Sequence, residues 1–125
     1  MLNDLTARDL QAKHKQWLLG KSIDGFRPLG PWLTSAEAVA PDALTLACCV
    51  DGGRRQHAST ADLIFDIPAI IASLSASMTL ECGDIIATAT PAGVGIGFDP
   101  PRFLHSGDRV RVAISGLGEI ENRIV

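Results

Sequence analysis

The fold is decided by the segment LTLACCVDGGRRQHA, residues 44–58. Residues 44–50 are mostly apolar, and the Asp-Gly-Gly at 51–53 separates them from a second short run at 54–58. Asp-Gly between two such runs favours a tight β-hairpin, because these residues adopt the positive φ angles that the turn needs. We therefore predict two strands, at 44–50 and about 54–58, in a mainly β chain with a few helices (α+β).

Two other parts of the chain have helical patterns. Apolar residues recur at helical spacing over 67–77, with Asp66 placed as an N-cap and Pro68 in the first turn. Residues 3–20 are polar and rich in good helix formers, and a Thr-x-x-Asp pattern that starts at Thr6 resembles a capping box. We predict a helix at about 67–77 and a helix within 3–20 that ends before residue 20.

The last third of the chain contains a short internal repeat. LECGDII at 80–86 and LHSGDRV at 104–110 share the pattern Leu-x-x-Gly-Asp-x-apolar. Each copy has the composition of a turn that leads into a strand, since glycine adopts positive φ freely. We predict strands at about 84–89, 108–114 and 119–125.

The composition limits the class of protein. Of the 125 residues, 46% are hydrophobic and 20% are charged, and the formal net charge is −3. This supplies enough apolar material for one domain and excludes a disordered chain. A weakly acidic chain is a poor binder of nucleic acid, and no stretch approaches the roughly 18 unbroken apolar residues of a membrane span. The first residues lack a basic start followed by an apolar run, so we expect no secretory signal. From the charge and the apolar pattern we expect neither a nucleic-acid nor a membrane partner.

The cysteines indicate a reducing compartment. Cys48, Cys49 and Cys82 are odd in number and contain no Cys-x-x-Cys pair. This favours reduced thiols in a cytoplasmic protein, where they act as small buried hydrophobic side chains. The three histidines show no zinc-ligand spacing.

Two glycine-rich loops are candidates for function. The first is GKSIDGFRPLGPW at 20–32, and the second is TPAGVGIG at 90–97. The second lacks the Gly-Lys-Ser/Thr ending of a phosphate-binding P-loop and precedes no clear helix, which argues against nucleotide binding. Its backbone can approach a ligand, with Thr90 offering a hydroxyl, or it is a simple connector.

The N-terminal residues offer a candidate binding face. Asp4, Arg8 and Gln11 follow i, i+4, i+7 spacing and can share one side of a helical turn. A carboxylate, a guanidinium and an amide together suit a hard metal ion and a carboxylate substrate. The alternative is a solvated helix face with a weak Asp4–Arg8 ion pair. Lys21, in the first loop, is either a surface lysine or a group that neutralises a developing enolate.

Five motifs resemble the fumarylacetoacetate hydrolase family, in the order that the family has them. They are NDLTARDLQ at 3–11, GKSIDGF with PLGPW within 20–32, MTLECGDII at 78–86, TPAGVG at 90–95 and PPRFL at 100–104. Each motif is modestly specific, whereas the set is highly specific and covers the whole chain. The resemblance identifies residues 1–125 as a single partial domain, the C-terminal catalytic portion of the family, truncated on its N-terminal side.

The resemblance implies a fold and a chemistry. The fold is a mixed β-sandwich or β-roll with a few helices, incomplete here, in an enzyme that is usually a homodimer. The family holds Mg²⁺ or Mn²⁺ with three carboxylates and acts on small 2-oxo or 1,3-dicarbonyl acids, as in aromatic catabolism. Its reactions are C–C hydrolysis, decarboxylation, hydration or isomerisation through a metal-stabilised enolate.

The resemblance also assigns roles to single residues. Asp4 resembles a metal-binding carboxylate, and Lys21 resembles the active-site lysine. Arg8 and Gln11 resemble residues that line the substrate site. Thr90 resembles the threonine that touches the acid group of the substrate.

One departure bears on activity. The family's other two metal ligands are glutamates of an upstream Glu-x-Glu segment that this chain does not contain, and Glu119 with Glu121 lies elsewhere, in the last predicted strand. A single carboxylate binds Mg²⁺ poorly, so we expect weak or no catalysis by the chain alone. The alternatives are a non-catalytic scaffold or interaction module, and a half-enzyme complemented by a separate chain. A truncated sheet exposes apolar surface, so we expect a dimer or a complementing chain.

Overall fold

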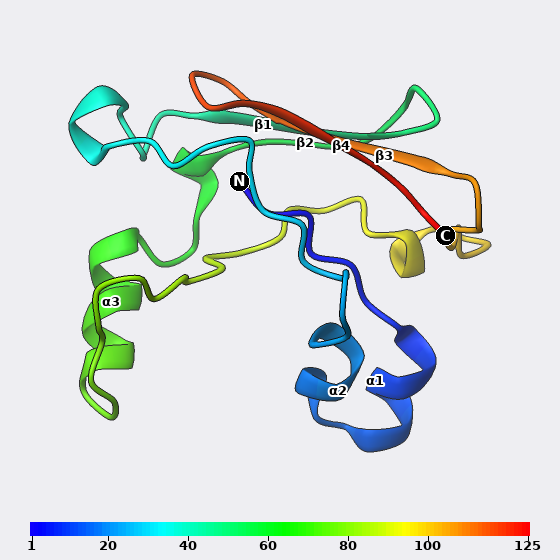
Figure 1. Cartoon of the computed structure of the whole chain (residues 1–125), viewed down its shortest axis with the longest axis horizontal. Helices are drawn as coiled ribbons and strands as arrows, with labels where there is room; N and C mark the ends of the chain where they lie inside the picture. Colours follow the sequence, from blue (N-terminus) through cyan, green and yellow to red (C-terminus); the bar gives the residue numbers. More distant parts are fainter.

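The computed structural model describes all 125 residues and contains one four-stranded sheet and three α-helices. The elements are α1 (Arg8–His14), α2 (Trp17–Lys21), β1 (Thr45–Val50), β2 (Gly53–Ser59), α3 (Ile67–Ser75), β3 (Arg109–Ile114) and β4 (Gly118–Arg123), with 3₁₀ turns η1 (Ala36–Ala38), η2 (Thr60–Asp62) and η3 (Gly95–Gly97). Figure 1 shows the sheet along one side, with α3 and the α1–α2 pair projecting from it as separate units. The predicted mainly β fold with a few helices is confirmed.

The hairpin that the sequence predicts is present. Strands β1 and β2 pair antiparallel, and Asp51 and Gly52 have φ angles of 48° and 77° in the turn between them. The register shifts between Cys48 and Cys49, which leaves Arg55 of β2 without a partner in β1. This bulge matters for the site, because it turns the Arg55 carbonyl toward the second glycine-rich loop.

The sheet has the order β2-β1-β3-β4 and is antiparallel throughout. One face carries the small core of Cys48, Val110 and Val112, against which Met1, Val50, Ile120 and Ile124 pack. The other face is charged and solvated: Arg109 pairs with Glu121 at 3.2 Å, and Arg111 pairs with Glu119. The Glu-x-Glu of β4 is therefore engaged in cross-strand ion pairs on an exposed face.

The predicted helix within residues 3–20 is two short helices. The capping box is wrong, because α1 begins after Ala7 with no side-chain cap, and the Thr6 hydroxyl instead accepts a hydrogen bond from Lys21 Nζ. Lys15 ends α1 with a φ of 55°, and α2 then runs through Gly20 to Lys21. The prediction that the helix ends before residue 20 is also wrong.

Helix α3 matches its prediction. Asp66 is the N-cap and its carboxylate accepts a hydrogen bond from Ala69 N at 2.8 Å, while Pro68 lies in the first turn. The helix begins at Ile67 as expected and ends at Ser75, two residues early.

The strand predicted at 84–89 is absent. Residues 84–90 form neither a helix nor a strand, whereas the strands predicted at 108–114 and 119–125 are present as β3 and β4. In Figure 1 the irregular segment runs from the end of α3 across the molecule toward η3. No backbone hydrogen bond joins residues 85–90 to another part of the chain, so no strand ladder forms there.

Very little of the chain is buried. Five residues fall in the buried class: Asn3, Gly20, Cys48, Val110 and Val112. Fifteen large hydrophobic side chains are exposed, among them Trp17, Leu33 and Ile64. Cys82 is exposed as well, so the expectation that all three cysteines are buried is wrong. None of the helices has the length and apolar character needed to cross a membrane.

Candidate active site

The centre of the candidate site is an ion pair between Asp4 and Lys21. Lys21 Nζ donates to Asp4 Oδ2 and, at 3.0 Å, to Thr6 Oγ1. The two side chains are largely shielded, with 15% of Lys21 and 23% of Asp4 exposed. The sequence placed Asp4 and Lys21 in the site separately, and the structure brings them into direct contact.

Hydrogen bonds made by the residues just before and just after Asp4 fix its position. Asn3 is buried, and its amide donates to Asn122 Oδ1 of β4 at 3.2 Å. The backbone of residues 1–5 then runs beside residues 26–30, through Asn3 N to Pro28 O at 3.1 Å and Leu5 N to Phe26 O at 3.2 Å. A residue between two such anchors has little freedom, so Asp4 is attached rigidly to the edge of the sheet.

Lys21 is positioned by close packing of α2 on α1. Gly20 lies so near α1 that an added Cβ would be 2.9 Å from Ala7 O and 3.0 Å from Gln11 Cβ. Ala7 N also donates to Gly20 O at 2.8 Å. Only glycine permits this approach, which brings the following residue, Lys21, beside Asp4.

Arg8 and Gln11 form a second polar pair on α1. Arg8 Nη1 donates to Gln11 Oε1 at 2.7 Å. The predicted alternative of an Asp4–Arg8 ion pair is wrong, because the carboxylate of Asp4 is paired with Lys21 and lies next to Arg27. Gln11 also packs against Gly20, the residue that precedes Lys21.

One oxygen of Asp4 has no hydrogen bond. Oδ1 is inaccessible to solvent and without a hydrogen-bond partner, and Arg27 Nε lies 3.7 Å from it. That distance allows electrostatic attraction and is too long for a hydrogen bond. A buried carboxylate oxygen without a donor is costly, and it is the kind of atom that a cation satisfies.

Two site residues were missed by the sequence analysis, Arg27 and Thr6. Arg27 lies in the first glycine-rich loop, which was singled out as a functional loop without naming this side chain. Thr6 was assigned to a helix cap. Arg27 meets Asp4 through the pairing of residues 1–5 with 26–30, and Thr6 meets Lys21 through the packing of α2 on α1. No local pattern reveals either contact.

The second glycine-rich loop packs against the β2 bulge. Gln56 Nε2 donates to Pro91 O at 2.9 Å, and a Cβ on Gly93 would be 1.9 Å from Arg55 O. Glycine is required at 93 by this contact and by its φ of 102°. Thr90 is exposed, makes no hydrogen bond, and has no contact that joins it to Asp4 or Lys21.

The chain does not contain a complete metal site. No group of three or more His, Cys, Asp or Glu side chains lies close enough together to hold an ion. The donor set at Asp4 is one carboxylate with one unsatisfied oxygen. These residues fit a hard divalent cation as a single ligand and do not fit it as a full coordination shell.

Comparisons with known proteins connect this geometry to a family. The family model for the C-terminal region of fumarylacetoacetate (FAA) hydrolase matches residues 1–125. Oxaloacetate tautomerase YisK of Bacillus subtilis is 50% identical over 125 residues, which are 99% of this chain and 42% of that protein. The solved fumarylacetoacetate hydrolase of Exiguobacterium antarcticum is 46% identical, with a TM-score of 0.96 over 98% of this chain and 44% of that one.

A further solved relative was captured with ligands. The maleylpyruvate hydrolase of Sphingobium sp. SYK-6, in complex with manganese(II) and pyruvate, is 44% identical, with a TM-score of 0.78 over 88% of this chain and 39% of that one. The chain thus spans less than half the length of each relative that it resembles here. With a match to the family model along its whole length, this chain belongs to the fumarylacetoacetate hydrolase family and corresponds to its C-terminal portion.

Proposed function

We propose that this chain supplies part of the active site of a metal-dependent enzyme acting on small 2-oxo or 1,3-dicarbonyl acids. The reaction belongs to the hydrolase, lyase or isomerase chemistry of the family. The observation that carries the proposal is the shielded Asp4–Lys21 pair, in which Asp4 Oδ1 is buried and lacks a hydrogen bond. In a stable protein, such an oxygen is retained where a ligand satisfies it.

In this proposal, three residues of the chain bind different parts of the substrate. Lys21, held by Asp4 and Thr6, places positive charge where negative charge develops on the substrate. Arg8 uses one of its five donors on Gln11 and keeps the others for a substrate carboxylate. Thr90 offers an uncommitted hydroxyl from the second loop, in a role that requires the loop to face Asp4 once the site is complete.

The metal ion in this proposal is Mg²⁺ or Mn²⁺. A bound divalent cation would supply positive charge that polarises a carbonyl oxygen of the substrate. Asp4 is its one ligand in this chain, and acidic residues outside the chain supply the others. The manganese(II) and pyruvate in the Sphingobium relative support this choice, since pyruvate is itself a 2-oxo acid.

Three consequences follow from the partial site. The chain alone has weak or no catalytic activity, because one carboxylate holds Mg²⁺ poorly. Full activity requires a homodimer or a complementing polypeptide. The cytoplasmic location stays a prediction from the cysteines, and the place in aromatic catabolism stays a prediction from the family resemblance.

The proposal is tested by calorimetric titration with Mn²⁺ in the presence of oxalate, which supplies two carboxylate oxygens as a substrate mimic. We expect binding that weakens about tenfold or more in Asp4→Ala, as loss of a metal ligand requires. Asp9→Ala is the matched control, because Asp9 is an exposed acidic residue five positions away on α1 and makes no ion pair. Binding by Asp4→Ala that equals binding by Asp9→Ala contradicts the proposal and favours a non-catalytic scaffold.

A further inference from the structure

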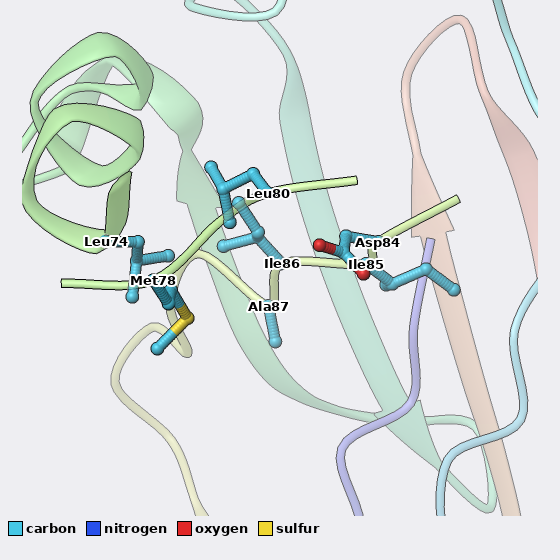
Figure 2. Close-up of a pocket in the computed structure, with 7 residues that line it drawn as sticks. All are labelled: Leu74, Met78, Leu80, Asp84, Ile85, Ile86 and Ala87. Atoms are coloured by element: carbon cyan, nitrogen blue, oxygen red, sulfur yellow. The ribbon is translucent and has the colours of Figure 1, made fainter. Parts of the chain in front are cut away.

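The largest hollow of the chain offers little to a polar ligand. It measures about 370 Å³ and is lined by six apolar residues, among them Leu74, Met78 and Ile86, and by Asp84 (Figure 2). The carboxylate of Asp84 is already engaged, because its Oδ2 accepts a hydrogen bond from Glu81 N at 2.8 Å. Charged groups without a partner lie instead beside the second glycine-rich loop.

Two of these charged groups, the side chains of Arg55 and Arg102, share one aromatic ring. The guanidinium carbon of Arg55 lies 5.2 Å from the centroid of the Phe98 ring, and that of Arg102 lies 4.8 Å from it. The two guanidinium carbons are therefore at most about 10 Å apart, the sum of these distances. That is about one Debye length at about 0.1 M salt, so the two positive charges repel each other.

Neither arginine has a counter-ion within the chain. No carboxylate lies within ion-pair distance of either guanidinium, and neither side chain forms a hydrogen bond. Asp99, the acidic residue next to Phe98, is exposed and makes no ion pair. Arg109 and Arg111 differ in this respect, because each pairs with a glutamate of β4. The charge beside the second loop is therefore uncompensated.

The guanidinium of Arg55 is also partly enclosed by the chain itself. Its Nη1 is inaccessible to solvent and has no hydrogen-bond partner, whereas Nε and Nη2 are unpartnered and remain accessible. Stacking on the Phe98 ring uses the face of the guanidinium, and the N–H donors point outward in its plane. The ring therefore leaves these donors open. A charge that has lost part of its water attracts an anion more strongly than a fully solvated one.

The backbone holds both arginines against the same loop. A Cβ on Gly93 would lie 1.9 Å from Arg55 O, and a Cβ on Gly95 would lie 2.3 Å from Arg102 O. Arg102 N also donates to Gly95 O at 2.9 Å. Side chains that start from a fixed backbone lose less freedom when they bind a ligand.

We propose that Arg55 and Arg102 bind a small, doubly charged oxyanion, a phosphate or a dicarboxylate, beside the second glycine-rich loop. Guanidinium groups recognise both, because pairs of N–H donors match pairs of oxygens. A dianion neutralises the two positive charges. It also links β2, which carries Arg55, to the chain that follows the loop. Asp4 and Lys21 take no part, so this inference stands or fails separately from the proposed function.

The test titrates the isotope-labelled chain with sodium phosphate and, separately, with sodium succinate at constant ionic strength, and follows the backbone amides by NMR. We expect saturable shifts confined to residues near Arg55 and Arg102, with a dissociation constant of about 1–10 mM for at least one anion. Sodium chloride should give no saturable shift, because chloride has a single charge and no pair of oxygens. A response to one of the two oxyanions alone identifies the class that the site takes.

Four variants identify the groups that bind. Arg55→Gln and Arg102→Gln each remove one charge and should weaken binding about tenfold or more. Phe98→Leu keeps both charges and removes the ring that holds them, so it should weaken binding about two- to fivefold. Arg123→Gln is the matched control, because Arg123 is an exposed arginine of β4 without an ion pair. It should bind within about twofold of the wild type.

Three outcomes overturn the inference. The first is the absence of saturable shifts with both oxyanions. The second is wild-type affinity in Arg102→Gln, or equal weakening in Arg123→Gln, which would mean a response to net charge alone. Arg102 is exposed, so its variant should keep the fold, and its amide spectrum without added anion checks this. The third is a dimer that Arg102→Gln dissociates, which would assign the arginines to an interface between copies of this chain.

Discussion

The two Leu-x-x-Gly-Asp turns of this chain have matching geometry and different surroundings. In the first, Gly83 has a φ of 103° and Asp84 Oδ2 accepts from Glu81 N at 2.8 Å. In the second, Gly107 has a φ of 102° and Asp108 Oδ2 accepts from His105 N at 2.8 Å. The residues after the second turn form β3, between β1 and β4. The residues after the first turn pair with nothing.

The comparison separates turn formation, which depends on local residues, from strand formation, which depends on distant ones. Five residues suffice to form the turn, because its glycine and its aspartate side chain satisfy it internally. A strand also needs a neighbour for its backbone groups. At the start of β3, Arg109 N donates to the Asp51 carboxylate at 2.9 Å. Residues 85–90 make no equivalent hydrogen bond.

The largest change in the free energy of unfolding should come from replacing one of two glycines that have nearly equal φ angles and different surroundings. Gly93→Ala places a Cβ 1.9 Å from Arg55 O at a φ of 102°, and steric overlap with backbone strain should cost about 4 kcal/mol. Gly83→Ala, at a φ of 103° in open space, should cost about 1 kcal/mol from strain alone. Urea unfolding measures both. Similar losses would mean that the Gly93 loop does not pack on the β2 bulge.

The next largest change in the free energy of unfolding is expected from apolar residues that follow the two turns, when each is truncated to alanine. Val112 of β3 is 5% exposed, so Val112→Ala should lower the free energy of unfolding by about 2 kcal/mol. Ile85→Ala, after the first turn, should cost less than about 0.5 kcal/mol, because Ile85 is 64% exposed. Urea titration of both variants decides the matter. If Ile85→Ala were as costly, residues 85–90 would be packed against the rest of the chain.

A smaller effect is expected at the aspartates of the turns themselves. Asp108→Ala removes the bond to His105 N beside β3 and should cost about 1 kcal/mol. Asp84→Ala removes the same bond where no strand follows, and global unfolding should change by less than about 0.3 kcal/mol. Thermal unfolding of the pair provides the comparison, and equal costs would show that both turns belong to one cooperative unit.

The smallest effect concerns Cys48 in the core beside β3. Burial, followed by the neighbouring Cys49 thiol, raises the pKa of Cys48, and Arg55 opposes this. The folded chain therefore holds the thiol proton more tightly than the unfolded chain, and stability should fall slightly as the pH rises above about 8.5, the ordinary thiol pKa. Cys48→Ala should lose this component of the pH dependence, as measured by urea unfolding between pH 7 and 10. An unchanged slope in Cys48→Ala would contradict it.

Much of the fold follows from the sequence. The β1–β2 hairpin, the Asp66 cap of α3, both turns and the strands β3 and β4 were all predicted, because each depends on residues that are close in the chain. The strand at 84–89 failed for the opposite reason. Its propensity is correct, but its pairing depends on a neighbour that the chain does not supply.

The residues of the candidate site also fall into those that local motifs predict and those that only the tertiary structure reveals. Asp4 and Lys21 were identified from motifs, and the structure adds their contact. Arg27 was missed because it reaches Asp4 through the long-range pairing of residues 1–5 with 26–30, and Thr6 because it reaches Lys21 through the packing of α2 on α1. The capping box failed because the Thr6 hydroxyl binds Lys21 instead of the helix terminus. Tertiary contacts here override a local preference.

Amide hydrogen exchange tests the central claim most directly, by comparing residues 85–90 with β3 in this chain. We expect amides of 109–114 to be protected, because β3 is paired on both sides. Amides of 85–90 should exchange freely, because they form no backbone hydrogen bond. Protection of 85–90 equal to that of 109–114 would contradict the account.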